Sequence, residues 1–356
     1  MSELRVCYFG AYDPEYPRNL ILRRGLAMAG ARVTECNAPR NVSTRRKIPI
    51  LSRQFHSLEC HPDVIVLAEF GQALAPLAWR LARRVGAMLI VDAFTSVYDS
   101  AVWDRKTARP GSLTAMRYRL IDRVALRLAD LALTDTAQHC DYFSKMFGAP
   151  ARKFVVVPVG APREWFETPD ASSGENGLLV QFYGSYIPLH GVEVIVRSIH
   201  KLGKQPGLRF ELIGRGQTYA GVRAAADELD LPGIAFRESV AADKLPALVA
   251  RANISLGIFG VTPKAARVIP NKVYQTLALG KPVITADTLA LRERFTPGEH
   301  LLATPPGDSD ALAEAIRTLA GNAALRAELG RRGQRAAAAF TEEALGKQLV
   351  ARLQAL

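Results

Sequence analysis

The 356-residue sequence lacks the patterns that mark several common classes of protein. Its four cysteines, Cys7, Cys36, Cys60 and Cys140, show no CxxC spacing, which favours reduced thiols over disulfides or a zinc site. No apolar run approaches the roughly 20 residues that a membrane-spanning helix requires. The start, MSELRVCYFG, is typical of a strand rather than a signal peptide, so we expect a protein of the cytoplasm.

Motifs for metal and nucleophilic chemistry are also missing. The six histidines show no metal-ligand spacing, and no P-loop, GxSxG or HExxH pattern occurs. Asp308, Ser309 and Asp310 spell the DxD pattern of metal-dependent sugar transferases. Because they precede the helical pattern ALAEAIRTLAG, we interpret them as a helix N-cap and expect no metal site.

Acidic residues are scarce relative to basic ones, mainly in the first half. The formal charge is +12, of which residues 1–165 contribute +9 and residues 166–356 contribute +3. Basic residues cluster within 40–53 and within 105–127, the second with arginines at helical spacing. Such surfaces attract anionic lipid headgroups, nucleic acid or an acidic substrate, or are simply solvated. Nucleic acid is disfavoured, because interleaved aromatic platforms and reader motifs are missing.

Short apolar, β-branched runs alternate with longer helical patterns along the chain, which predicts an α/β fold with parallel sheets. We predict two doubly wound, Rossmann-like domains at 1–165 and 178–340, joined by a polar linker at 166–177. A last helix at 341–356 begins at the N-cap Thr341 and needs a partner surface for its apolar face. The predicted strands are 4–9, 32–36, 63–68, 87–92, 130–135, 154–158, 178–184, 208–214, 233–238, 254–259, 282–287 and 300–304.

The loops after the strands are the first place to look for a site, because open parallel sheets bind ligands beyond the carboxyl ends of their strands. Gly184 ends a predicted strand, and Ser185 and His190 lie in the loop that follows. The next helix starts near Gly191, so its free N–H groups and these side chains can face a diphosphate. The alternative is a glycine turn with a helix-capping loop.

The segment LIGRGQTY offers a second candidate. Gly214 and Gly216 would let the backbone approach a ligand closely, and Arg215 would stack on a base or pair with a phosphate. A dinucleotide-binding GxGxxG motif is excluded, because Tyr219 occupies its last position.

The segment RVIPNKVYQ predicts a helix that begins at Pro270 with a cation in its first turn. A helix N-terminus favours acidic side chains, so Lys272 is misplaced unless an anion such as a ligand phosphate lies there. Asn271 and Gln275 share a face of this helix, and Arg267 precedes it. The alternative is a surface loop whose cations are solvated, which the apolar neighbours disfavour.

In the first half, Asp92 ends a predicted strand, and Tyr98 and Asp99 follow it. A carboxylate at that place can orient a hydroxyl or act as a base. A turn-capping aspartate is an equally good explanation. Weaker candidates at equivalent strand ends are Gly10, Asp13, Glu69 and Gly71.

The order of these segments resembles the family 4 glycosyltransferases of the GT-B fold. The resemblance is carried by residues 134–166 and by YGSYIPLHGVEVIVRSIHKL, LIGRGQ, ADKLPALVARANISLGIF and LALGKPVITAD. It implies two domains facing across a cleft, with the C-terminal helix returning to the first. The first domain would bind the acceptor, and the second the nucleotide sugar.

The resemblance also implies an activity. Such an enzyme transfers a sugar from a nucleotide-diphosphate donor, with UDP or GDP, to a saccharide or lipid-linked acceptor with retention of configuration. It needs no cofactor and no bound metal, and it works in polysaccharide or glycolipid assembly. For lipid-linked members it implies a peripheral contact between the basic first domain and an anionic membrane.

The chain departs from the family pattern at charged positions. The family's glycine loop has Arg and Lys where this chain has Ser185 and His190, and its two glutamates correspond to Arg267 and Gln275. We expect Arg267 to meet phosphate or a carboxylate on the donor sugar, and we predict that Lys272 neutralises the diphosphate. Asp92, His190 and Arg267 form the expected catalytic set. The alternatives are a nucleotide-sugar epimerase and a degenerate protein that binds nucleotide sugar without transfer.

Overall fold

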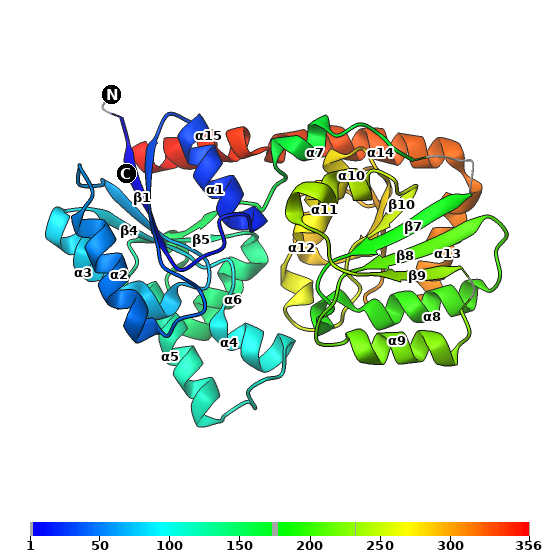
Figure 1. The fold of residues 1–356 in the computed structure, drawn as a ribbon, viewed down its shortest axis with the longest axis horizontal. Helices are drawn as coiled ribbons and strands as arrows, with labels where there is room; N and C mark the ends of the chain where they lie inside the picture. The colour runs from blue at the N-terminus through cyan, green and yellow to red at the C-terminus, as the bar shows by residue number, and fades with distance from the viewer. Residues whose placement is uncertain (1–2, 173–176, 232, 356) are drawn as a thin grey trace. The chain divides into compact units, whose positions relative to one another are not determined.

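The computed structural model describes residues 3–172, 177–231 and 233–355 of the chain. The chain divides into two compact units, which are drawn in Figure 1. Unit 1 comprises Met1–Gly160 and Phe340–Leu356, and unit 2 comprises Ala161–Ala339.

The predicted linker, 166–177, begins inside unit 2. Its first residues belong to helix α7 (Arg163–Glu167), and Asp170 pairs with Lys281 of the same unit. The Ala171 N–H group donates to the Ala250 carbonyl at 3.2 Å. Residues 173–176 of the predicted linker lie outside the described residues.

Each unit contains a six-stranded parallel sheet, which confirms the predicted fold class. The strand order is β2-β1-β3-β4-β5-β6 in unit 1 and β12-β11-β10-β7-β8-β9 in unit 2. The strands of unit 1 are β1 (Arg5–Gly10), β2 (Arg32–Asn37), β3 (Val64–Leu67), β4 (Met88–Asp92), β5 (Leu131–Thr134) and β6 (Phe154–Val156). Those of unit 2 are β7 (Leu178–Tyr183), β8 (Leu208–Ile213), β9 (Ile234–Arg237), β10 (Ile254–Leu256), β11 (Val283–Ala286) and β12 (Leu302–Thr304).

In each sheet the order in which the chain adds strands reverses at one point, which lies between β1 and β3 in unit 1 and between β7 and β10 in unit 2. At such a switch point the loops after the two neighbouring strands run to opposite faces of the sheet. Ligands of open α/β sheets bind there, at the carboxyl ends of the strands.

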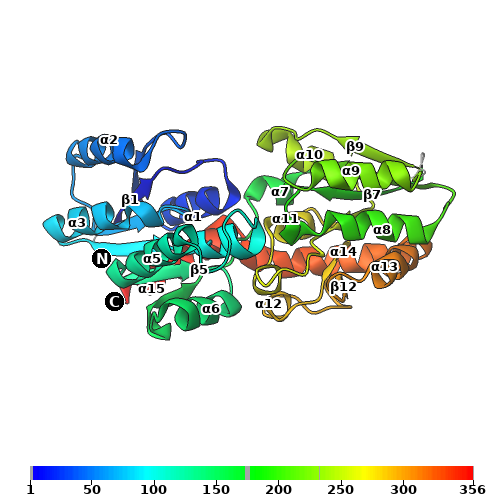
Figure 2. The same ribbon diagram turned by 90° about the horizontal axis from the view of Figure 1, so that it is seen from below.

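Helices connect the strands in both units (Figures 1 and 2). In unit 1 they are α1 (Pro17–Met28), α2 (Thr44–His56), α3 (Ala75–Val85), α4 (Val97–Asp99), α5 (Leu113–Leu128), α6 (Ala137–Phe147) and α15 (Glu342–Gln354). Beside α7, unit 2 has α8 (Val192–Leu202), α9 (Tyr219–Glu228), α10 (Leu245–Val249), α11 (Asn271–Ala278), α12 (Leu289–Arg292), α13 (Ser309–Gly321) and α14 (Ala323–Ala337). Shorter single turns are η1 (Gln72–Leu74), η2 (Ser100–Asp104), η3 (Ala151–Lys153), η4 (Pro188–His190), η5 (Ala242–Lys244), η6 (Ala265–Arg267) and η7 (Ala338–Phe340).

Every predicted strand overlaps an observed one. The largest error is at 254–259, where the strand β10 ends at Leu256. The apolar run continues because Ile258 and Phe259 are buried in the loop after the strand, although they form no part of the sheet. The apolar pattern at these two residues therefore reflects burial and not pairing in the sheet.

Alternate residues of the strands in unit 1 enter two separate cores. Val6 and Tyr8 pack on one face with helices α1 and α15, and Cys7 and Phe9 pack on the other with residues of α2 and α3. This arrangement is expected for a sheet with both faces covered.

Helix α15 packs along α1, and the two helices lie side by side in Figure 1. Gly25 and Gly346 form the closest approach, since a Cβ atom on either would overlap the backbone of the other helix. Thr341 caps α15 by accepting a hydrogen bond from the Ala344 N–H group at 3.2 Å. The apolar residues Leu345 and Leu349 are buried in the core of unit 1.

None of the helices in the described part of the chain is both long enough and apolar enough to cross a bilayer.

Candidate functional site

Three residues meet at the carboxyl end of β7, beside the switch point of unit 2. Gly184 follows β7 with φ of 144°, which favours glycine. A Cβ atom on Gly184 would lie 2.9 Å from Lys272 Nζ and 3.1 Å from His190 Cε1. The structure therefore brings Gly184, His190 and Lys272 together.

Lys272 is a buried cation in the first turn of α11. Its exposed fraction is 6%, and Nζ lies 3.9 Å from the centroid of the Phe182 ring. Among the described residues, Nζ has no hydrogen-bond partner and no carboxylate at ion-pair distance. Burial lowers the pKa of Lys272 well below its ordinary value. A desolvated ammonium without a counter-charge is costly, so this place is suited to an anion.

The N-terminus of α11 adds positive potential of its own. Its N-cap is Pro270, whose side chain makes no capping hydrogen bond, and its first turn contains no acidic residue. Free N–H groups and the helix dipole favour a negative group at such an end. Lys272 and the helix terminus therefore attract the same kind of ligand.

His190 is held in a defined orientation beside Lys272. Its Nδ1 atom contacts the Ser185 carbonyl oxygen, which can only accept, so the ring donates from Nδ1. The backbone of His190 is fixed by the Phe259 N–H group, which donates to its carbonyl at 3.0 Å. Burial, followed by the charges of Lys272 and Lys264, lowers the pKa of His190 well below its ordinary value. A neutral ring leaves Nε2 as an acceptor for a ligand hydroxyl.

Gln275 ties α11 to β7. It is buried, and its amide oxygen accepts a hydrogen bond from the Tyr183 hydroxyl at 3.1 Å. Trp165 stacks on the same tyrosine, with ring centroids 6.0 Å apart. This hydrogen bond fixes the orientation of the Gln275 amide between α11 and β7.

The glycines of the LIGRGQTY segment are required by the packing of two loops. A Cβ atom on Gly214 would overlap the Gly184 carbonyl oxygen, and one on Gly216 would lie 2.6 Å from the Tyr186 nitrogen. They are needed for the close packing of this loop against the loop that follows Gly184. Arg215 points its guanidinium to Glu238 and lies over the Tyr219 ring, 4.6 Å from its centroid.

The remaining predicted donor-side residues lie on the same segments. Ser185 is exposed, and its contribution to the described contacts is the carbonyl that His190 contacts. Asn271 is half-buried at the first position of α11. Arg267 is half-buried at the end of η6, in the loop that leads from β10 to α11.

Asp308 is the N-cap of α13, as predicted. Its Oδ1 atom accepts hydrogen bonds from the N–H groups of Asp310 at 3.0 Å and Ala311 at 2.9 Å. Within the described residues, no three His, Cys, Asp or Glu side chains gather as metal ligands.

Asp92 in unit 1 is completely buried in an ion pair with Arg18. The Arg18 guanidinium donates to both carboxylate oxygens, with Nη2 2.9 Å from Oδ1 and Nε 3.0 Å from Oδ2. The same guanidinium donates through Nη1 to the Val157 carbonyl at 2.5 Å. A carboxylate so enclosed and neutralised is suited to a structural role, and it has little access to a substrate.

Glu69 follows β3 at the switch point of unit 1. It is buried, and its Oε2 atom has no hydrogen-bond partner among the residues that the structure describes. Burial and the charge of Asp92 raise the pKa of Glu69 to about 7. The next residue, Phe70, has φ of 57° and is 49% exposed, which is a strained backbone for an aromatic residue. Glu69 is thus a stronger acceptor-side candidate than the sequence suggested.

Tyr98 and Asp99 lie on the short helix α4. The carboxylate of Asp122, from α5, accepts from the Tyr98 N–H group at 2.9 Å and from the Ser96 hydroxyl at 2.7 Å. Asp99 is fully buried, and Tyr98 packs with the apolar residues around it. Sequence reasoning missed Asp122, which anchors this whole turn.

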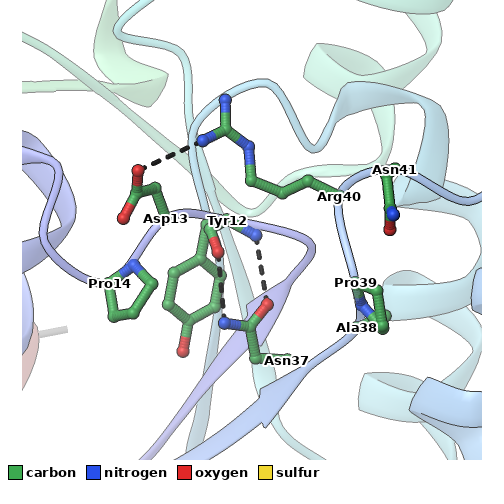
Figure 3. Close-up of a pocket in the computed structure, with 8 residues that line it drawn as sticks. All are labelled: Tyr12, Asp13, Pro14, Asn37, Ala38, Pro39, Arg40 and Asn41. Carbon is green, nitrogen blue, oxygen red and sulfur yellow. Dashed lines mark hydrogen bonds and ion pairs between the residues drawn. The ribbon is translucent and has the colours of Figure 1, made fainter.

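A surface hollow of about 410 Å³ lies at the carboxyl ends of β1 and β2 (Figure 3). Asn37 holds its wall through hydrogen bonds of 3.1 and 3.2 Å to the backbone of Tyr12. Arg40 lies 3.2 Å from Asp13 across it, and the two side chains are 64% and 46% exposed. Gly10, at the end of β1, would place a Cβ atom 3.3 Å from Ala68 Cβ, so it allows β1 and the loop after β3 to come close.

Two family models match this chain. "Glycosyl transferase 4-like domain" matches residues 3–160, and "Glycosyl transferases group 1" matches residues 176–322. A search of curated proteins gave no match.

Solved structures with the same fold span the whole chain. HepE from Anabaena, crystallised with UDP and glucose, is 16% identical, with a TM-score of 0.75 over 99% of this chain and 100% of that one. Sucrose-phosphate synthase from Thermosynechococcus elongatus is 16% identical, with a TM-score of 0.78 over 99% and 98%. A glycosyltransferase from Rickettsia africae is 12% identical, with a TM-score of 0.67 over 99% and 98%.

The structural likeness establishes the fold, and the two matched models together span most of both units. The chain belongs to the glycosyltransferases of the GT-B fold that carry a family-4-like N-terminal domain.

Proposed function

We propose that the protein is a retaining glycosyltransferase that binds a nucleotide-diphosphate sugar in unit 2 and transfers the sugar to a saccharide or lipid-linked acceptor. The observation that carries this proposal is the buried Lys272 ammonium beside Gly184 and His190, at the switch point of the sheet. A diphosphate there would supply the counter-charge that the described residues do not provide.

Lys272 and the N-terminus of α11 would stabilise the charge that develops on the departing diphosphate. A fixed cation can perform the neutralisation that other sugar transferases give to a metal, so we propose a metal-independent transfer. His190 Nε2 would accept a hydrogen bond from a hydroxyl of the donor sugar. Arg267 would meet a phosphate or a carboxylate of the donor.

The nucleotide base of the donor and the class of the acceptor are proposed by analogy. HepE has been crystallised with UDP and with UDP-glucose, so UDP-sugars are the first donors to test. On the acceptor side, the Glu69 carboxyl and the hollow beside Asp13 lie at the carboxyl edge of unit 1, where a hydroxyl-bearing acceptor would bind. We place the enzyme in the cytoplasm, in polysaccharide or glycolipid assembly.

Ligand-induced thermal shifts test the donor site directly, since a ligand of the native state raises the melting temperature. We expect UDP or another nucleoside diphosphate to stabilise the wild type and to stabilise Lys272→Met much less. Loss of a charge-assisted contact of about 2–3 kcal/mol corresponds to an affinity weaker by about 30- to 160-fold. Equal affinity in the variant would contradict the proposal.

Arg215→Gln is the matched control, because it removes an exposed cation of the same unit that is already paired with Glu238. It should retain the shift.

Product analysis separates transfer from the alternatives. Radiolabelled UDP-sugars are incubated with an extracted lipid acceptor, and the anomeric configuration of the product is determined. Labelled product with retained configuration supports the proposal. Binding without product would indicate a degenerate binding protein, and interconversion of free nucleotide sugars would indicate an epimerase.

A further inference from the structure

The turn after β3 holds an exposed aromatic residue in an unfavourable backbone conformation. The Gly71 N–H group closes this turn by donating to the Ala68 carbonyl at 3.0 Å, and Phe70 is the third residue of the turn. Phe70 has φ of 57°, a value that favours glycine or asparagine, and it is 49% exposed. Two other non-glycine residues of the described chain have positive φ, Lys106 and Asp230, and neither carries an aromatic ring. Folding gives Phe70 neither a relaxed backbone nor full burial, which points to a role outside folding.

Two buried oxygen atoms in the same segment need hydrogen-bond donors. Glu69 is 7% exposed and Gln72 is 3% exposed. Glu69 Oε2 and Gln72 Oε1 have no hydrogen-bond partner among the residues that the structure describes. The Gln72 amide nitrogen is already engaged, because it donates to the Thr95 carbonyl at 2.5 Å. An amide oxygen and an ionised carboxylate can only accept, so both atoms call for a ligand that donates.

These residues lie at the carboxyl edge of the sheet in unit 1, beside its switch point. The Ala68 N–H group donates to the Phe9 carbonyl at 2.9 Å, which joins the start of the turn to the end of β1. Open α/β sheets bind their ligands at this edge. An aromatic surface and two buried acceptors therefore occur together where a ligand is expected.

We propose that Glu69, Phe70 and Gln72 form a subsite for one neutral sugar unit of the acceptor. This inference rests on the proposed function and narrows its acceptor. A pyranose ring has C–H groups on its faces and hydroxyls around its rim. One face stacks on the Phe70 ring, and rim hydroxyls donate to the Glu69 and Gln72 oxygens. Small-molecule sites commonly combine apolar surface with a few polar groups in this way.

Two other kinds of ligand fit this segment less well. An apolar ligand would cover the aromatic ring and leave both buried oxygens unsatisfied, which is costly. A phosphate or carboxylate would lie against the Glu69 carboxyl. Arg18 and Arg40, whose charges act on Glu69, are each paired with an aspartate already. A neutral donor of hydrogen bonds meets neither difficulty.

Saturation-transfer NMR tests the subsite in the absence of any sugar donor. The probes are the methyl glycosides of glucose, galactose, mannose and N-acetylglucosamine, with methyl glucuronide as the anionic probe. We expect the wild type to transfer saturation to the ring C–H protons of at least one neutral glycoside, most strongly on one face of the ring. No transfer to any neutral glycoside, or tighter binding of methyl glucuronide, would overturn the proposal.

The variant Phe70→Asn removes the ring and keeps a residue that tolerates positive φ. It should bind the neutral glycoside about tenfold more weakly, because the stacking contact is lost. Glu69→Met keeps a side chain of similar size without the acceptor oxygens, and it should weaken binding about fivefold or more. Trp79→Gln is the matched control, since Trp79 is a 37% exposed aromatic residue in the regular helix α3. It should bind as the wild type does.

Melting temperatures separate a ligand-binding ring from a structural one. Phe70→Asn should melt at the temperature of the wild type or above it, because backbone strain is relieved. A clearly lower melting temperature, or undiminished binding of the glycoside, would show that the Phe70 ring does not serve a sugar.

The thermal shift caused by UDP keeps this inference apart from the proposed function. Phe70→Asn should retain that shift, since the proposed UDP site lies in unit 2. A wild type that binds a glycoside but not UDP would contradict the proposed function. A wild type that binds UDP but none of the neutral glycosides would contradict only the subsite.

Discussion

The two units each place a basic residue at the second position of a helix that follows a strand at the switch point, with opposite outcomes. Arg18 and Lys272 are both the second residue of a helix, α1 in unit 1 and α11 in unit 2, and both are buried. Arg18 is paired with the buried carboxylate of Asp92, whereas Lys272 has no carboxylate partner in the described residues. A cation in the first turn of a helix therefore indicates that a negative group is needed nearby. The sequence position alone does not show whether the protein or a ligand provides that group.

The carboxyl edges of the two sheets differ accordingly. In unit 2 the unmet charge is positive and suits an anion. In unit 1 the cation is satisfied, and the Glu69 carboxyl is one of the groups with an unpartnered oxygen among the described residues. An edge of that kind suits neutral, hydroxyl-bearing ligands. Two parallel sheets of related architecture can thus suit two binding chemistries through the placement of one carboxylate.

The largest predicted effect compares the two cations through protein stability. Asp92→Ala should lower the free energy of unfolding of unit 1 by about 3–5 kcal/mol, because it leaves Arg18 charged and buried without its partner. Lys272→Met should leave stability unchanged or raise it, since it removes a desolvated cation. Calorimetric melting of both variants measures the difference. A large loss in Lys272→Met would mean that this lysine has a structural role like that of Arg18.

A second prediction concerns the Glu69 carboxyl. Its pKa is raised from 4.5 to about 7 in the native state, so the native protein binds more protons than the unfolded chain between these values. The contribution of Glu69 to stability is then fully present at low pH and falls as pH rises through this window, by up to about 3 kcal/mol. Glu69→Gln should flatten this part of a stability profile measured by urea unfolding. An identical pH profile in the variant would contradict the assignment.

Titration of Lys272 should change the free energy of unfolding with pH in the opposite direction. Its native pKa is lowered, so between that value and 10.5 the unfolded chain binds more protons, and stability rises with pH by at most about 1.4 kcal/mol per unit. A bound diphosphate restores the charged form, so UDP binding in that range should take up a proton. Calorimetric titrations in buffers of different ionisation enthalpy measure this uptake. Lys272→Met should show neither the slope nor the uptake.

The sequence predicted the fold well because its signals are local. Apolar runs and the intervening helical patterns marked all twelve strands, and Thr341 and Asp308 cap helices where their sequence neighbours indicate. It also singled out Lys272, since a cation in a first turn is visible without a structure. Arg18 offers the same signal after Pro17 but was missed, and only the fold shows that Asp92, 74 positions away, satisfies it.

The same limit applies to two glycines of unit 2 and to the exposed apolar residues of α5, which are Leu113, Met116 and Leu120. The sequence suggested a ligand-facing role for Gly214 and Gly216, and it gave no sign that both also pack against the backbone of another loop. That outcome depends on how far apart two loops lie, which spacing along the chain cannot give. The apolar residues of α5 also fit a helix buried on that side, so their exposure could be known only from the structure.

The smallest predicted effect concerns Arg215, the exposed cation at the edge of unit 2. Its guanidinium pairs with Glu238, and both side chains are more than half exposed, so water and salt screen the pair. Arg215→Gln should change stability by less than about 1 kcal/mol and should leave UDP affinity within a few-fold of the wild type. Glu238→Gln sharpens this prediction, because it frees Arg215 without removing it. A rise in UDP affinity together with greater sensitivity to salt would mean that Arg215, once released, can turn to the ligand. Lys272 would then differ from Arg215 in its burial and not in the sign of its charge.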